Sequence, residues 1–402
     1  MIHAFRLIGR DPTLRLMMLA MLLQGGFAAS VGTYQSLIAV TVFGLSDNGY
    51  ALVLVASLLV SVTASIGVGI LTDQRPSRRA LALCAAGAMA AGALLVLAGR
   101  SAPAFVLAHV LLLPVTGTLF GQLFAVARLV TAPLPRADRD GIMAIIRATF
   151  ALPFVVLLAI WGLLFDAGAP LIAVYGWTAI TGAVLMALIL TRWPHDAQAP
   201  WTEVKSGLGF RAALSELTHG PVLLRVGLVG AIHSGSALSG VIVGLLLNAV
   251  PGRGAGDVGA FFAIFVALEI AVTLSIGALR RHFRRLHIIA VGVFIYAAGM
   301  ALLPVLAGGP ALWLLCLPYG IGGAMLYALA IGYLQDLLGS RAGAGASLLA
   351  LQQIAAQGLG ALAFALGAAL GGYGLAAVIG SVVMTLAMLA ILWLDRNAPL
   401  DA

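Results

Sequence analysis

Charged residues are scarce in this sequence, at 9% of 402 residues, whereas a soluble domain has about 25%. Hydrophobic residues reach 62%, which is more apolar surface than the interior of a soluble protein of this length can bury. The low charge content therefore excludes an ordinary soluble protein. The composition predicts a protein whose solvent is the lipid bilayer.

Other absences exclude whole classes of function. The two cysteines, Cys84 and Cys316, lie inside apolar runs, so no disulfide framework is expected. No P-loop occurs, which argues against ATP as the energy source, and no His, Cys or carboxylate spacing is typical of a metal site. We expect no cofactor. The net charge of +8 comes from arginines in short loops without interleaved aromatics, so no nucleic-acid partner is expected.

Long apolar runs dominate what is present. They are about twenty residues long and do not alternate, which predicts membrane-spanning helices and not barrel strands. The sequence therefore predicts an all-α integral membrane protein with about twelve spans. The runs are 14–42, 49–71, 80–99, 103–127, 142–165, 170–191, 223–247, 257–279, 286–307, 311–335, 345–370 and 373–394.

A polar stretch at 192–221 separates the first six runs from the last six, so residues 1–191 and 222–402 are expected to form two bundles. Apolar residues recur at helical spacing in this stretch, which favours an amphipathic linker on the membrane surface. The first run is expected to be a retained helix and not a signal peptide, because no small-residue cleavage site follows it.

Arginine and lysine positions predict the orientation of the chain. If both termini are cytoplasmic, the outer loops carry only Arg100 and Arg253. The inner loops then carry Arg75, Arg78, Arg79, Arg128, Arg136, Arg139, Arg192, Lys205, Arg211, Arg280, Arg281, Arg284, Arg285 and Arg341. This bias predicts a multi-pass protein with cytoplasmic termini. Lys205 is the one lysine, and with so much alanine and glycine this suggests a GC-rich bacterial genome, so a bacterial inner membrane is expected.

The chain also repeats itself. Gly69-Ile-Leu-Thr-Asp73 precedes Arg78-Arg79 after the second run, and Gly277-Ala-Leu-Arg-Arg281 precedes Arg284-Arg285 after the eighth, 208 residues later. Two six-helix halves in parallel order are an architecture of secondary transporters.

The loop from Gly69 to Arg79 resembles the loop 2–3 signature of the major facilitator superfamily, with a Gly, an Asp four residues later and then basic residues. The resemblance implies that Gly69 and Asp73 belong to a cytoplasmic gate, where Arg78 or Arg79 could pair with Asp73. Topology alone also accounts for these arginines. The second half has Arg281 at the position of Asp73, so Asp336 is the candidate for the missing carboxylate.

Other segments resemble the bacterial sugar efflux transporters. These are Gln122-Leu-Phe-Ala-Val-Ala-Arg128, Ile146-Arg147-Ala148 and Leu23-Gln24-Gly25 with Gln35 later in the same run; Leu152-Pro153-Phe154 stands where that family has Gly-Pro-Pro. The resemblance implies proton-driven export of small sugars and makes Gln122 a candidate for binding the solute.

Four ionisable residues stand out in the apolar runs, because ionisable groups at membrane depth cost about 2.5–3.5 kcal/mol on insertion scales. Glu269 is near mid-bilayer, and desolvation favours its neutral form, so it is either a proton-coupling carboxyl or a structural acid. Arg147 either binds substrate oxygens or reaches the cytoplasmic interface. His233, beside small residues, is either a cavity or a core histidine, and His109 is expected to be structural.

Glutamines mark two helix faces. Gln24 and Gln35 fall on one stripe of the first run, because spacings of four, three and four connect them through Ala28 and Val31. Gln353 and Gln357 lie one turn apart in the eleventh run. Both pairs either face a solute cavity or form hydrogen bonds between helices.

These patterns together predict a monomeric, proton-coupled exporter of a small polar solute such as a sugar. Its partners would be the solute, protons and the lipid bilayer. An exporter of drugs or amphipathic metabolites is the first alternative. A membrane-embedded enzyme is disfavoured because no paired acids, histidine cluster or nucleophile motif is present. A sensor is disfavoured because no large soluble domain is present.

Overall fold

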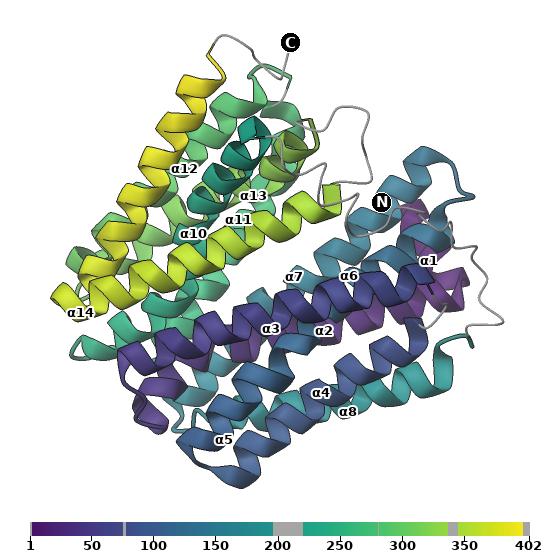
Figure 1. Cartoon of the computed structure of the whole chain (residues 1–402), viewed down its shortest axis with the longest axis horizontal. Helices are drawn as coiled ribbons and strands as arrows, with labels where there is room; N and C mark the ends of the chain where they lie inside the picture. Colours follow the sequence, from purple (N-terminus) through teal and green to yellow (C-terminus); the bar gives the residue numbers. More distant parts are fainter. Residues whose placement is uncertain (1, 75–77, 196–219, 280, 337–344, 397–402) are drawn as a thin grey trace. The chain divides into compact units, whose positions relative to one another are not determined.

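A computed structural model gives the fold of the protein. It describes residues 2–74, 78–195, 220–279, 281–336 and 345–396, which form helices joined by short connections (Figure 1). No strand occurs in these ranges, as expected where a bilayer forces each segment to satisfy its own backbone hydrogen bonds. The all-α fold predicted from the sequence is confirmed.

The first half contains the helices that were expected from the apolar runs and one that was not. They are α1 (Ile2–Arg10), α2 (Pro12–Leu37), α3 (Asp47–Gln74), α4 (Arg78–Gly99), α5 (Ala102–Leu107), α6 (Leu113–Thr131), α7 (Arg136–Asp166) and α8 (Ala173–Arg192). Two π-helical segments, Ile38–Val42 and Ala108–Leu112, extend α2 and join α5 to α6. Helix α1 was not expected, because the first apolar run begins only at residue 14.

The second half contains α10 (Gly220–Ala249), α11 (Ala255–Leu279), α12 (Arg285–Leu306), a short 3₁₀ helix (Pro310–Leu315), α13 (Cys316–Asp336) and α14 (Gly345–Leu394). Most of the predicted linker, 196–219, lies outside the described residues. Within this half, α14 packs against α10 and α12, and α13 packs against α11 and α12.

The described helices include 11 that are long and apolar enough to cross a membrane. The last of these stretches, Leu351–Leu394, has 44 residues and contains two of the predicted spans. Helix α14 breaks at Gly371 and Gly372, and Figure 1 shows its two arms folded back on each other. Gly372 has φ 80°, a left-handed conformation that glycine adopts at little cost. The twelve spans are confirmed with this break counted.

The chain divides into two compact units, Met1–Gly44 with Ala56–Ser206, and Leu45–Val55 with Gly207–Ala402. In the first unit, helices approach each other closely at glycine residues. A Cβ on Gly25 would collide with the Phe150 carbonyl oxygen, and one on Gly182 would lie 2.7 Å from the Ala90 nitrogen. Small residues of this kind let helices pack tightly in a membrane.

Candidate functional site

Two glutamines of the first unit are buried, one on α2 and one on α6. Gln24, on α2, donates from Nε2 to the Thr116 carbonyl oxygen at 3.1 Å. Gln122, on α6, donates to Thr118 Oγ1 at 3.5 Å. Within the described part of the chain, neither Oε1 atom has a hydrogen-bond partner. Each amide is therefore oriented by its donor side and keeps a buried acceptor that can still accept a hydrogen bond.

The other two candidates of the first unit differ in burial. Gln35 is half-buried on α2, and Arg147 is exposed on the surface of the unit, well inside α7. No hydrogen bond or ion pair joins either side chain to another described residue. A bare guanidinium is costly in hydrocarbon, so the position of Arg147 favours a watery environment or the interface.

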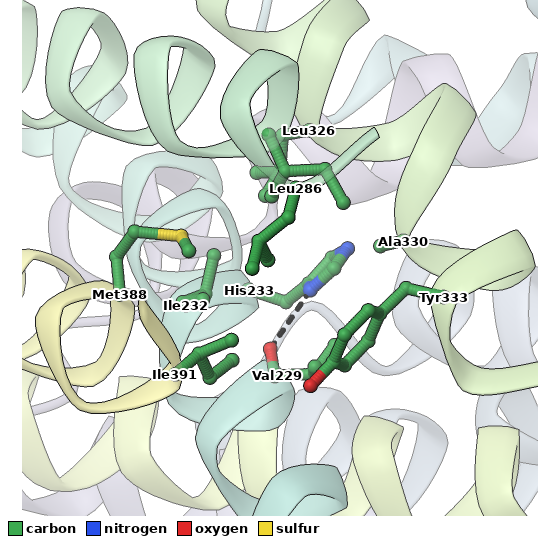
Figure 2. Close-up of a pocket in the computed structure, with 10 residues that line it drawn as sticks. Val229, Ile232, His233, Leu286, Leu326, Ala330, Tyr333, Met388 and Ile391 are labelled. Carbon is green, nitrogen blue, oxygen red and sulfur yellow. Dashed lines mark hydrogen bonds between the residues drawn. The ribbon is translucent and has the colours of Figure 1, made fainter. Parts of the chain in front are cut away.

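His233, in the second unit, borders a small cavity. Its Nδ1 lies 2.9 Å from the Val229 carbonyl oxygen; a carbonyl only accepts, so Nδ1 carries the hydrogen. Figure 2 shows the ring among apolar side chains, including Leu286 and Leu326. The cavity measures about 10 Å³, which is room for about one water molecule. It is too small for a sugar.

Glu269 lies on α11 and is half-buried. Its carboxyl faces the backbone of α13, because a Cβ on Gly323 would lie 3.0 Å from Oε2. One turn further along α13, Tyr327 donates from its hydroxyl to Ser236 Oγ, and its ring meets the ring of His233 edge-on at 5.5 Å between centroids. In the described ranges, the Glu269 carboxyl has no hydrogen bond or ion pair, so no counter-ion among them stabilises its charged form.

Gln353 and Gln357 are exposed on one face of α14. The neighbouring Gln352, which was not among the candidates, is buried at 6% exposure. Its Nε2 has no hydrogen-bond partner among the residues described. Gln353 and Gln357 therefore share one face of the helix, as their spacing predicts. The buried glutamine of α14 is instead Gln352.

The gate residues are only partly described. Gly69 is exposed in α3, and Arg79 donates from Nη2 to the Leu190 carbonyl oxygen at 2.8 Å and from Nη1 to His195 Nδ1 at 3.1 Å. Arg78 begins α4. The backbones of Asp73 and Asp336 lie in the last turns of α3 and α13, but their side chains lie outside the described part of the structure. The proposed pairing of Asp73 with an arginine stays a prediction.

His109 lies in the π-helical segment between α5 and α6 and is 4% exposed. Its Nε2 is 2.6 Å from the Tyr175 hydroxyl, and its ring stacks on Phe105 at 4.1 Å. These contacts favour the expected structural role.

A buried ion pair in the second unit was not expected from the sequence. Arg225, on α10, donates from Nε and Nη2 to Oδ1 of Asp395 at 2.9 and 2.7 Å, and the Tyr333 hydroxyl donates to Oδ2 at 2.8 Å. The Asp395 side chain is 1% exposed and that of Arg225 17%. An arginine in the seventh span and an acid at the end of the twelfth were the available signal, but their partnership needs the fold.

The arrangement of long apolar helices and few buried polar groups is typical of a multi-pass membrane transporter. Residues 16–372 match the family model of the Major Facilitator Superfamily. The chain belongs to that superfamily and is a transporter, not an enzyme, whose partners include a small-molecule substrate and the bilayer.

One relative is a Deinococcus radiodurans protein described as a candidate sugar efflux transporter. It is 35% identical over 141 residues, which cover 34% of this chain and 36% of that protein. The match thus spans about a third of the relative.

Solved structures share the fold. The nucleoside transporter NupG matches with a TM-score of 0.75 at 15% identity, covering 96% of this chain and 100% of that one. A POT family transporter in complex with a thioalcohol-conjugated peptide has a TM-score of 0.76 at 10% identity, covering 96% of each chain. The human organic anion transporter MFSD10 has a TM-score of 0.61 at 16% identity, covering 94% of this chain and 98% of that one. At these identities the likeness concerns the fold alone.

Proposed function

We propose that this transporter exports a small polar solute such as a sugar by alternating access, driven by protons. The observation that carries the proposal is the pair of buried amides, Gln24 and Gln122, which keep unpartnered acceptor oxygens in the described part of the chain. Such oxygens accept hydrogen bonds from sugar hydroxyls. The description of the Deinococcus relative as a candidate sugar efflux transporter supports the same class of solute.

The remaining polar candidates have secondary roles in this proposal. Arg147 binds solute oxygens through its fork of donors, and Gln35, Gln353 and Gln357 add amide contacts. His233 borders the polar cluster of α10 and α13, which includes Ser236 and Tyr327. Gly69, Asp73, Arg78, Arg79 and Asp336 form the cytoplasmic gate.

Placement in the cell follows the arginine bias. Both termini face the cytoplasm of a bacterium, and the protein works in the inner membrane as a monomer with bundles at 1–191 and 222–402, joined by the linker 192–221. Cysteines introduced at Pro135 and Ala197 should resist impermeant thiol reagents in intact cells. Labelling at Ala197 from outside would overturn this topology.

Glu269 is the proton-coupling group. It is the acid that lies well inside an apolar run, and its carboxyl becomes neutral when protonated, so it crosses a dry intermediate more easily with its proton than without. Since the described residues offer it no counter-ion, protons and solute hydroxyls can compete for it.

The solute class is tested by ligand-induced thermal shifts of the purified protein with sugars, amino acids and cationic drugs. We expect stabilisation by sugars, weakened about fivefold in apparent affinity in Gln24→Leu or Gln122→Leu, since each loses a hydrogen bond worth about 1 kcal/mol. Gln352→Leu, which removes a buried glutamine of the second unit, is the matched control. Stabilisation only by cationic drugs would replace the proposal with drug efflux.

Coupling is tested in proteoliposomes with an imposed proton gradient. Glu269→Gln mimics the protonated acid, so it should still exchange solute across the membrane at equal concentrations but lose accumulation against a gradient. Uphill transport as strong as that of the parent would make Glu269 structural.

A further inference from the structure

Helix α1 carries two faces of opposite character. On one face, Ala4 and Ile8 are 5% and 1% exposed and belong to the core of the first unit, and Leu7 packs against that core. A Cβ on Gly141, near the start of α7, would lie 3.4 Å from the Ala4 Cβ. The helix is thus held against α7 and α2 and cannot turn its other face inward.

The outer face combines an aromatic ring with positive charge. Phe5 is 54% exposed, and Arg6, Gly9 and Arg10 are exposed beside it. α1 contains no acidic residue. An exposed aromatic flanked by arginines is typical of helices that lie in the membrane interface.

The nearby carboxylates are engaged elsewhere. Asp11 caps α2 by accepting from the Thr13 and Leu14 amides at 2.8 and 2.9 Å. Asp138 lies 3.5 Å from His3, and Asp140 lies 3.7 Å from Arg136. Across the described ranges, no carboxylate pairs with Arg6 or Arg10, so both guanidinium groups remain available to an external anion.

The position of α1 identifies that anion. Asp11 is the one residue between the end of α1 at Arg10 and the start of the first span at Pro12, so α1 lies at the membrane surface. We propose that α1 is a binding site for anionic phospholipid headgroups. Arg6 and Arg10 hold the phosphate, and Phe5 enters the boundary between headgroups and acyl chains. This proposal does not depend on the cargo or on proton coupling.

The test uses the full chain with an environment-sensitive fluorophore on Gly9→Cys, in a Cys84→Ala/Cys316→Ala background. Nothing lies within 4 Å of a Cβ at Gly9, so the label is tolerated and Phe5 is kept. The detergent-solubilised protein is titrated with phosphatidylglycerol, and separately with phosphatidylcholine of the same acyl chains. We expect an emission shift with phosphatidylglycerol at far lower concentration.

Arg6→Gln/Arg10→Gln should weaken the phosphatidylglycerol response about 25-fold, because each arginine contributes about fivefold. The matched control is Arg128→Gln/Arg192→Gln, which removes two exposed arginines at the ends of α6 and α8; it should change the response less than about threefold. Phe5→Ser should weaken it as well. Equal losses in the two double variants, or equal responses to both lipids, would overturn the proposal. A shift caused by glycerol phosphate alone would assign the face to a soluble anion and overturn it too.

Discussion

Removing the negative charge from the buried ion pair of the second unit should unfold the protein at a much lower temperature. In Asp395→Asn, Arg225 loses the carboxylate that accepts its Nε and Nη2 bonds at 2.9 and 2.7 Å, and Tyr333 loses a charged acceptor. Breaking a buried pair from one side costs about 3–5 kcal/mol. For a bundle of this size the loss corresponds to roughly 6–20 °C.

Two further variants separate the contribution of the Tyr333 hydrogen bond from that of the two charges. Tyr333→Phe removes one hydrogen bond to a charged group and should cost about 1.5–3 kcal/mol. Arg225→Met/Asp395→Leu removes both charges and replaces them with apolar volume, so it should recover most of the stability lost in Asp395→Asn.

The assay is thermal unfolding of purified protein in detergent, followed by tryptophan fluorescence. An Asp395→Asn protein that unfolds within about 2 °C of the parent would refute the reasoning, and so would a double variant as unstable as the single one. Either result would mean that the pair is solvated enough to lose little when broken.

Three other changes have expected outcomes. Gly323→Ala should leave the unfolding temperature near that of the parent, because the flexible Glu269 carboxyl can yield, but should shift the pH of half-maximal transport; an unchanged pH profile would contradict this. Arg253 donates from Nη1 to Asp257 at 2.9 Å, from Nε to the Ala307 carbonyl oxygen at 3.1 Å and from Nη2 to that of Gly309 at 2.7 Å. Arg253→Lys, which keeps the charge but not the fork, should therefore lose at least about 1.5–3 kcal/mol of unfolding free energy; retained stability would show that charge alone suffices. Tyr175→Phe strips buried His109 of its 2.6 Å partner and should cost about 1–3 kcal/mol with transport preserved; lost transport at full stability would give His109 a functional role.

The large features of the fold could be predicted because a segment that crosses the bilayer must be long and apolar, and such segments are visible in the sequence. Spans of about twenty apolar residues, their repeat after 208 residues and the loop after Gly69 were enough for the fold class and the superfamily. Helix α1 was missed because nine residues are too few to span a membrane, and its pattern becomes meaningful only once Ala4 and Ile8 are seen against the first unit.

The polar sites were harder to predict because they depend on how each helix is rotated. Burial of Gln24 and Gln122, the exposure of Gln353 and the burial of its neighbour Gln352 all follow from helix packing. Arg225 and Asp395 are 170 residues apart, and no local pattern connects them. The depth of Glu269 could be estimated from its place in an apolar run, whereas the glycine that faces it could not.

The break at Gly372 decides whether the last apolar stretch crosses the membrane once or twice. A continuous helix through the 44 residues from Leu351 to Leu394 would be about 66 Å long, roughly twice the hydrocarbon thickness of about 30 Å. The chain reverses there instead, so a single left-handed residue returns Asp395 to the side where α10 begins, within reach of Arg225. A side chain at Gly372 would therefore destabilise both the turn and the ion pair between Arg225 and Asp395. The ion pair can form only if the last two spans run in opposite directions.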